Sequence, residues 1–234
     1  MFSNRYVFIY ASVMVIVVAI ALTLAAVSLK PFQEYNIKVE KMRNILTSVH
    51  IETTVDDAEK LFETYITDSY VVNFKGELVK DVKAFDLDLF YELKKQEKNP
   101  EDMLLPVFIC SKDQKTLYIF PARGKGLWGP IWGYISLNED FNTIYGTMFD
   151  HKAETPGLGA EISTLEFQLQ FDQKLIFDEE GKLVSIKTVK GGTSPDDPHG
   201  VDAISGGTIT SKGLEKMLLD CLSLYEPYLL KNKK

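Results

Sequence analysis

A run of 23 residues without a charge, residues 7–29, is the feature that most restricts how this chain can fold. It reads VFIYASVMVIVVAIALTLAAVSL. A helix needs about 20 apolar residues to cross the hydrocarbon core of a bilayer, so the run is long enough to span it. We therefore predict a transmembrane anchor over residues 1–30, followed by a soluble part.

The alternative for this run is a cleaved signal peptide. TLAAVS offers a cleavage site of the A-x-S kind, but the run is longer than the ~7–15 apolar residues of a signal peptide, and only Arg5 brings a charge before it. Its length favours an uncleaved anchor. Charge leaves the orientation open, because the positive-inside rule governs short loops rather than long domains. A simple charge count would place the soluble part in the cytoplasm, because four basic residues follow the run: Lys30, Lys38, Lys41 and Arg43.

Net charge and cysteine usage exclude some classes of function. The formal net charge is −7 and no basic stripe is visible, which argues against a nucleic-acid partner. Cys110 and Cys221 belong to no CxxC motif or Cys/His cluster, so we predict no metal site. We expect both thiols to pack as small apolar side chains. The sequence leaves open whether they form a disulfide.

Hydrophobic periodicity predicts the elements that follow the anchor. Helices are expected over residues 36–49, 56–66, 86–96 and 211–230, and strands over 69–74, 104–111, 116–122, 131–137, 143–150 and 183–189. A loop with a short helix is expected over 151–171, and a loop without secondary structure over 191–200. Hairpin-like strand pairs among helices indicate an α+β fold, with an antiparallel sheet and flanking helices.

Three segments carry more glycine and polar groups than packing needs. The first, GKGLWGPIWGYI at residues 124–135, holds four glycines and two tryptophans. Glycine allows close approach of the backbone, and tryptophan provides a flat apolar wall. The plainer interpretation is a glycine-rich turn that leads into a strand.

The second segment is HKAETPGLGAEIS, residues 151–163. Its polar groups, backbone N–H groups and small residues suit a planar ligand with hydrogen-bonding edges. The alternatives are a solvent-exposed His151 and a Glu154–Thr155 pair that only starts a helix. One histidine and one carboxylate are too few ligands for a metal ion.

The third segment is DAISGGTITSKG, residues 202–213. Thr208, Thr210 or Ser211 could each cap the last helix, although a capping box is absent. The start of a helix carries unpaired N–H groups and a partial positive charge, which favour a phosphate. Gly206 and Gly207 would let a phosphate, or an enzyme that delivers it, approach Thr208. These properties permit an anion site around a hydroxyl group without requiring one.

The third segment also resembles a known motif. SGGT, with an aspartate three residues before it, is similar to the flavinylation motif D-x-x-S-G-A-T, whose last threonine carries FMN through a phosphoester bond. The three segments and the anchor with LKPFQEYNIKVEKMRNIL resemble the NqrC family, the C subunits of the sodium-translocating NADH:quinone oxidoreductase, in order and spacing, over nearly the whole chain. The G subunit of the Rnf complex shares ETPGLG and the flavin motif, but GKGLW and the long segment before it fit the quinone reductase better.

The resemblance implies a set of site residues. Thr208 would carry the FMN, and its recognition sequence would be Asp202, Ser205, Gly206 and Gly207, with Gly207 in the usual place of alanine. Thr210 is also expected at the cofactor. The loop near the flavin ring would contain His151, Glu154, Thr155, Gly157, Leu158 and Gly159. No residue is expected to act as a catalytic acid or base.

The resemblance implies a membrane-proximal α+β region over residues 31–120 and an FMN-binding domain over 121–234. The chain would be an electron-transfer subunit of a respiratory complex that exports sodium, single-pass in the bacterial inner membrane, with its soluble domain in the periplasm. A flavin transferase would attach the FMN. Other subunits would bind quinone and NADH. The alternative from another class is a membrane-anchored binding or assembly module in which Thr208 is only a cap.

Overall fold

The computed structural model describes residues 3–96, 98–194 and 196–233, and it divides the chain into two compact units, Met1–Lys41 and Met42–Lys234. Helix α1 (Asn4–Thr47) contains the whole apolar run and continues through Pro31. Within the described residues, α1 is the one helix long and apolar enough to cross a membrane. The helix expected over residues 36–49 is confirmed up to Thr47, as the last part of α1.

The second unit contains the remaining elements. They are α2 (Ala58–Tyr65), β1 (Ile66–Asn73), β2 (Leu78–Val79), η1 (Ala84–Asp86), α3 (Leu89–Lys95), η2 (Pro100–Asp102), β3 (Leu104–Lys112), β4 (Lys115–Lys125), β5 (Pro130–Leu137), β6 (Ile144–His151), η3 (Gly159–Ser163), α4 (Leu165–Leu169), β7 (Lys187–Val189), β8 (Gly200–Asp202) and α5 (Thr208–Asn232). Here η marks a short 3-10 helix.

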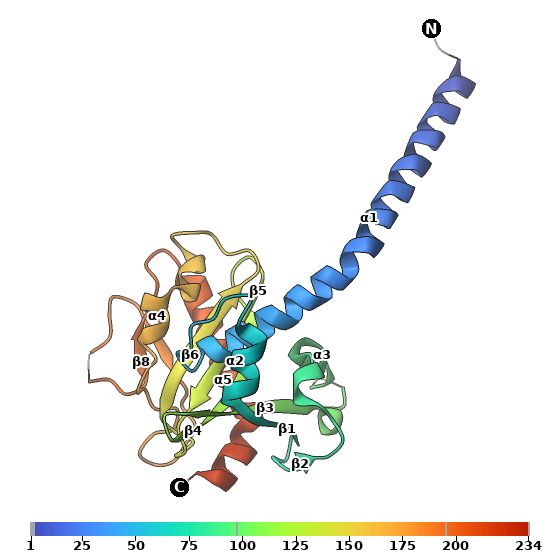
Figure 1. The fold of residues 1–234 in the computed structure, drawn as a ribbon. Coiled ribbons are helices and arrows are strands. Elements are labelled where there is room, and N and C mark those ends of the chain that lie inside the picture. Colours follow the sequence, from blue (N-terminus) through green and yellow to red (C-terminus); the bar gives the residue numbers. More distant parts are fainter. Residues whose placement is uncertain (1–2, 97, 195, 234) are drawn as a thin grey trace. The chain divides into compact units, whose positions relative to one another are not determined.

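Six strands form one antiparallel sheet in the order β2-β1-β3-β4-β5-β6 (Figure 1). Side chains alternate between its faces, as a strand's period of two requires. On β4, Phe120 and Ala122 point into one hydrophobic core, whereas Leu117 and Ile119 point into the other. The predicted α+β fold with an antiparallel sheet and flanking helices is confirmed.

The two faces of the sheet are covered by different helices. Helix α5 packs on the face of Phe120 and Ala122, and it passes along the sheet in Figure 1. Cys221 of α5 lies in this core, whereas Cys110 lies in the core on the opposite face. Both cysteines are free and buried, which answers the question of a disulfide. Burial raises the pKa of each thiol to about 11, so both stay protonated at neutral pH.

A short parallel sheet of β7 and β8 follows the large one in the chain order. The strand expected over residues 183–189 was partly wrong, because it begins only at Lys187. Ser185 has a φ of 56°, in the left-handed region that interrupts an extended strand. The loop expected over 191–200 ends in β8, whose first residue is Gly200.

The domain boundary that we placed between residues 120 and 121 falls inside β4 (Lys115–Lys125). The two compact units divide after Lys41, and the large sheet includes residues from both sides of position 120. The division into a membrane-proximal region and an FMN-binding domain stays a prediction.

Candidate functional site

The first of the three unusual segments forms the tip of the β4–β5 hairpin. Lys125 pairs with Pro130, so residues 126–129 make the turn. The Gly126 N–H donates to the Gly129 carbonyl at 2.8 Å. Trp128 lies at the tip and is 67% exposed, which is unusual for so large an apolar side chain.

The second segment begins beside this tip, because β6 pairs with β5 and places His151 opposite Ile131. The chain then turns back on itself. The Thr155 carbonyl accepts hydrogen bonds from the N–H groups of Leu158 and Ala160, at 3.1 and 3.2 Å. Gly157, with a φ of 74°, provides the left-handed residue of the turn.

The third segment reaches the same place through α5. A Cβ atom on Gly213 would meet the Lys125 carbonyl, so this glycine lets the first part of α5 pack directly on the end of β4. Residues far apart in sequence thus meet at one end of the β4–β5 hairpin.

Helix α5 begins at Thr208, three residues earlier than expected, with Gly207 as the N-cap and no side-chain cap hydrogen bond. The alternative in which Thr208, Thr210 or Ser211 caps the helix is therefore wrong. Thr208 is exposed in the first turn. Ser211 is buried and holds the preceding turn instead. Its Oγ accepts from the Ile204 N–H and donates to the Gly207 carbonyl, both at 3.0 Å.

The three segments enclose a pocket of about 260 Å³. Its lining consists of Leu127, Trp128, Glu154, Thr155, Leu158, Gly159, Gly206, Gly207, Thr208, Ile209 and Thr210. Eight of these residues were expected from the sequence: Glu154, Thr155, Leu158, Gly159, Gly206, Gly207, Thr208 and Thr210. The fold therefore brings the second and third segments together at the first one.

Four of the expected residues, all described by the structure, lie outside this lining: His151, Gly157, Asp202 and Ser205. His151 supports the loop, because its Nδ1 accepts from the Glu154 N–H at 3.2 Å. Asp202 is exposed on β8, and its carboxylate accepts from the Thr193 N–H at 2.6 Å. Neither residue is placed by the structure against the pocket itself.

Leu127, Trp128 and Ile209 were not expected as site residues, although the first and third segments contain them. Together with Leu158 and Thr208 they form what we call the exposed rim of the pocket, since all five residues are exposed. The signal was available in the sequence: two bulky apolar residues between glycines at a turn have few partners to pack against.

Below the rim is what we call the buried layer, formed by Gly126, Glu154, Gly159 and Thr210. Glu154 is 5% exposed. Its Oε1 accepts from the Trp128 N–H at 2.9 Å, and its Oε2 accepts from the Thr210 hydroxyl at 2.6 Å. Burying a carboxylate is costly unless it is hydrogen-bonded, and here both oxygens have donors.

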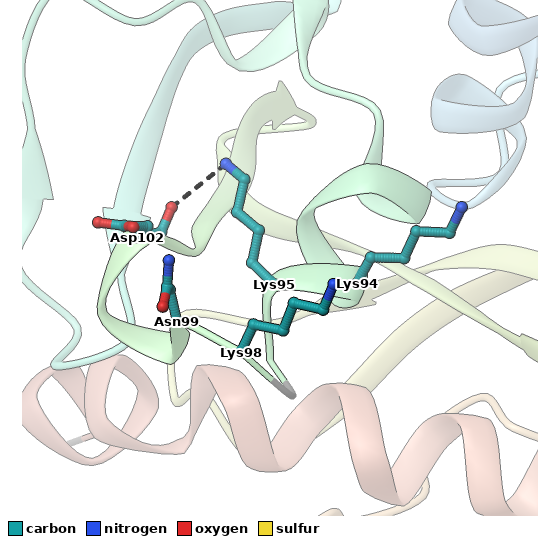
Figure 2. A pocket seen from close by; sticks show the side chains of 5 residues that line it. All are labelled: Lys94, Lys95, Lys98, Asn99 and Asp102. Carbon is teal, nitrogen blue, oxygen red and sulfur yellow. Dashed lines mark hydrogen bonds between the residues drawn. The ribbon is translucent and has the colours of Figure 1, made fainter.

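A second cavity of about 600 Å³ lies beside α3 and is lined by Lys94, Lys95, Lys98, Asn99 and Asp102 (Figure 2). Lys95 is already paired, because its Nζ binds both carboxylate oxygens of Glu92 at 2.9 and 2.8 Å and donates to the Asp102 carbonyl. Lys94 extends away from the other lysines in Figure 2. No residue expected at the functional site lines this cavity. Among the residues that the structure describes, no group of three or more His, Cys, Asp or Glu could hold a metal ion.

The chain combines an apolar helix long enough to span a membrane with an α+β unit that has an exposed hydroxyl at a helix start beside a pocket. These features define a class, membrane-anchored proteins suited to a phosphate-bearing cofactor. The family model of an FMN-binding domain matches residues 126–223, which include every residue that lines the pocket.

Relatives specify the family. The C subunit of the Na(+)-translocating NADH-quinone reductase of Neisseria meningitidis is 33% identical over 226 residues, 88% of this chain and 87% of that protein. The protein of the same name from Haemophilus ducreyi is 30% identical over 224 residues, 89% of this chain and 86% of that protein. The crystal structure of the corresponding protein from Parabacteroides distasonis is 41% identical, with a TM-score of 0.78 over 86% of this chain and 96% of that one. The chain belongs to the NqrC family, the C subunits of the Na(+)-translocating NADH-quinone reductase, which confirms the resemblance.

Proposed function

We propose that this chain is the FMN-carrying electron-transfer subunit of a sodium-translocating NADH:quinone reductase, and that FMN is bound covalently to Thr208 through a phosphoester. One observation carries the proposal. Thr208 presents an exposed hydroxyl at the first residue of a 25-residue helix, on the lining of the pocket that the three segments form.

The start of α5 suits a phosphate. Gly207 caps the helix without a side-chain hydrogen bond, so no cap side chain competes for the N–H groups of the first turn. These N–H groups and the helix dipole favour negative charge. Gly206 has a φ of 73°, and a Cβ atom there would meet the Leu158 side chain. The glycines thus keep the approach to the Thr208 hydroxyl open.

Attachment requires an activated flavin phosphate, which a flavin dinucleotide provides as a phosphoanhydride. The Thr208 Oγ forms a bond to the flavin-side phosphorus, and the bond from that phosphorus to the bridging oxygen breaks. Adenosine monophosphate leaves, and the hydroxyl proton passes to a base on the flavin transferase. Exposed Asp202 and Ser205, with Gly206 and Gly207, form the sequence that the transferase would recognise.

The pocket fits part of an isoalloxazine ring. Its volume of about 260 Å³ is below the ~300–1,000 Å³ of pockets that enclose a whole ligand, so the apolar rim would cover the rest. Thr155, Leu158 and Gly159 line the pocket and are proposed ring contacts, and Thr210 and Glu154 form a buried part of the same lining. His151 and Gly157 would shape the loop. FMN supplies the redox chemistry, and these residues hold it in place and set the polarity around it.

The remaining parts of the function belong to the complex. Other subunits would bind NADH and quinone, and sodium export would be a property of the assembly. We place the soluble unit in the periplasm and the anchor in the bacterial inner membrane. Alkaline phosphatase fused behind the last residue tests this topology, because the enzyme is active only after export. An inactive but stable fusion would count against the periplasmic side.

The covalent flavin is tested by producing the full chain with and without a flavin transferase. We expect a band that fluoresces under ultraviolet light on a denaturing gel only when the transferase is present. The tryptic peptide that contains Thr208 should then gain the mass of FMN less one water. A non-fluorescent protein in the presence of an active transferase would favour the binding or assembly module instead.

A further inference from the structure

Glu154 is the one lining residue with hydrogen bonds to both other segments, among the contacts that the structure describes. Its carboxylate accepts from the Trp128 N–H of the hairpin tip and from the Thr210 hydroxyl of α5, while its own N–H donates to His151. Removing this side chain would leave the Trp128 N–H and the buried Thr210 hydroxyl without their partner. Buried donors left unpaired cost free energy, so the three segments depend on this carboxylate for their mutual placement.

The surroundings are shaped for this side chain. A Cβ atom on Gly126 would meet the Glu154 Oε1, and a Cβ atom on Gly159 would meet the Oε2. Glycine at both positions therefore leaves room for the carboxylate between the hairpin tip and η3.

The bond to Thr210 acts on the position of Thr208. Successive residues of a helix are separated by about 100°, so residues two apart point about 200° apart, to nearly opposite sides. Thr210 is 1% exposed and faces inward to Glu154, whereas Thr208 is exposed. Anchoring the inward hydroxyl fixes the rotation of the first turn of α5, and with it the direction of the Thr208 hydroxyl.

We propose that Glu154 is a positioning residue for flavin attachment: it ties the hairpin tip to the first turn of α5 and so presents the Thr208 hydroxyl to the incoming flavin phosphate. This role rests on the proposed function. Glu154 does not form or break a bond in it. The Thr208 Oγ–P bond forms, the phosphoanhydride breaks, and the proton leaves for a base on the transferase, as described above.

The geometry distinguishes this role from a requirement for negative charge. In Glu154→Gln, the amide oxygen can accept from the Trp128 N–H, and the amide nitrogen can donate to the Thr210 Oγ, which is also an acceptor. The glutamine variant should therefore keep the placement. Glu154→Ala should lose both bonds. At Thr210, the partner of Glu154 on α5, Thr210→Ser keeps the hydroxyl group, whereas Thr210→Val keeps the shape of the side chain but loses the hydroxyl group.

The test measures flavin transfer to the full chain in detergent, with purified transferase and flavin adenine dinucleotide. For Glu154→Ala and Thr210→Val we expect kcat to fall by about tenfold or more with KM little changed, since small misplacements of reacting groups cause losses of this size. Glu154→Gln and Thr210→Ser should stay within about threefold of the unchanged chain, less than the loss expected from misplacement. Hydrogen–deuterium exchange of the Trp128 amide, measured without flavin, should be faster in Glu154→Ala and unchanged in Glu154→Gln.

Each other outcome contradicts a defined part of the argument. Unchanged kcat in both Glu154→Ala and Thr210→Val overturns the positioning role. A Glu154→Gln variant as slow as Glu154→Ala shows that the charge is needed, which also overturns it. If Glu154→Ala does not fold, Thr210→Val against Thr210→Ser decides the question. If the unchanged chain accepts no flavin, the proposed function fails, and unchanged amide exchange in Glu154→Ala would then reject the positioning role separately.

Discussion

The exposed rim and the buried layer of the pocket are close in sequence but differ in what surrounds them. Thr208 and Thr210 are two residues apart, yet one is exposed and the other is buried and bonded to Glu154. The rim has little packing to lose and presents groups to other molecules. The buried layer has hydrogen bonds and close contacts that fix the position of the exposed rim. Substitutions in the rim should therefore change function with little effect on stability, and substitutions in the layer should change both.

The largest effect is expected from the rim. Thr208→Ala should abolish covalent flavin, because it removes the acceptor oxygen. It should change the unfolding free energy by less than the about 0.5–2 kcal/mol lost with a helix cap, because the N-cap is Gly207. In-gel fluorescence and thermal unfolding check both parts.

Thr64→Ala is the matched control, since Thr64 is an exposed threonine on α2 and should leave the fluorescent band unchanged. A fluorescent Thr208→Ala protein would disprove the attachment site. A Thr208→Ala protein that unfolds much more easily would break the distinction between rim and layer.

The second prediction concerns the charge in the buried layer. Glu154→Gln should keep the flavin attached and raise its reduction potential, because a carboxylate beside the ring disfavours the anionic reduced form. A charge at short range is worth about 1–4 kcal/mol in a partly solvated site, which a spectroscopic redox titration resolves. Glu166→Gln, at an exposed position on α4, should leave the potential unchanged. An unchanged potential in Glu154→Gln would leave this residue with a positioning role alone.

The third prediction tests how tightly the buried layer is packed. Gly159→Ala should lower the unfolding free energy by about 1–3 kcal/mol, because the added methyl group would meet the Glu154 Oε2 and the Thr210 side chain. Gly129→Ala at the hairpin tip is the control, since its methyl group would make only ordinary contacts with Lys152 and Ala153, at 3.7 and 3.8 Å. Equal stability of the two variants would show that the layer can relax around a methyl group.

Much of the fold could be predicted from local sequence pattern. The strands of the hairpins alternate between two cores, so periodicity placed β3 to β6 within a few residues. The strand expected from residue 183 begins only at Lys187, because Ser185 has a left-handed φ and its N–H donates to the Ile176 carbonyl at 2.9 Å, a contact that strand periodicity does not record. The two-residue strand β2 is too short to show a period.

The site was predictable as three segments, but the roles within it were not. Sequence patterns identified Glu154, Thr208 and Thr210 as polar groups in unusual surroundings. Which of them is buried depends on how α5 packs on the sheet, and close contacts of Gly213 with Lys125 and of Gly124 with Met217 bring the helix onto β4. Contacts of this kind join residues about 90 positions apart, so no local pattern records them.

The smallest effect is expected at Thr155, which belongs to neither the exposed rim nor the buried layer. It lines the pocket and is exposed, and its backbone carbonyl closes the turn to Leu158. If its hydroxyl donates to the flavin ring, Thr155→Val should remove one hydrogen bond, worth about 0.5–1.5 kcal/mol, and shift the potential less than Glu154→Gln does. The backbone bonds of the turn remain in this variant, so attachment at Thr208 and thermal stability should stay unchanged. Titration of both variants under the same conditions checks the order of the two shifts. Two titrations that match the unchanged chain would show that the loop from residue 151 to 159 shapes the pocket without setting the potential of the flavin.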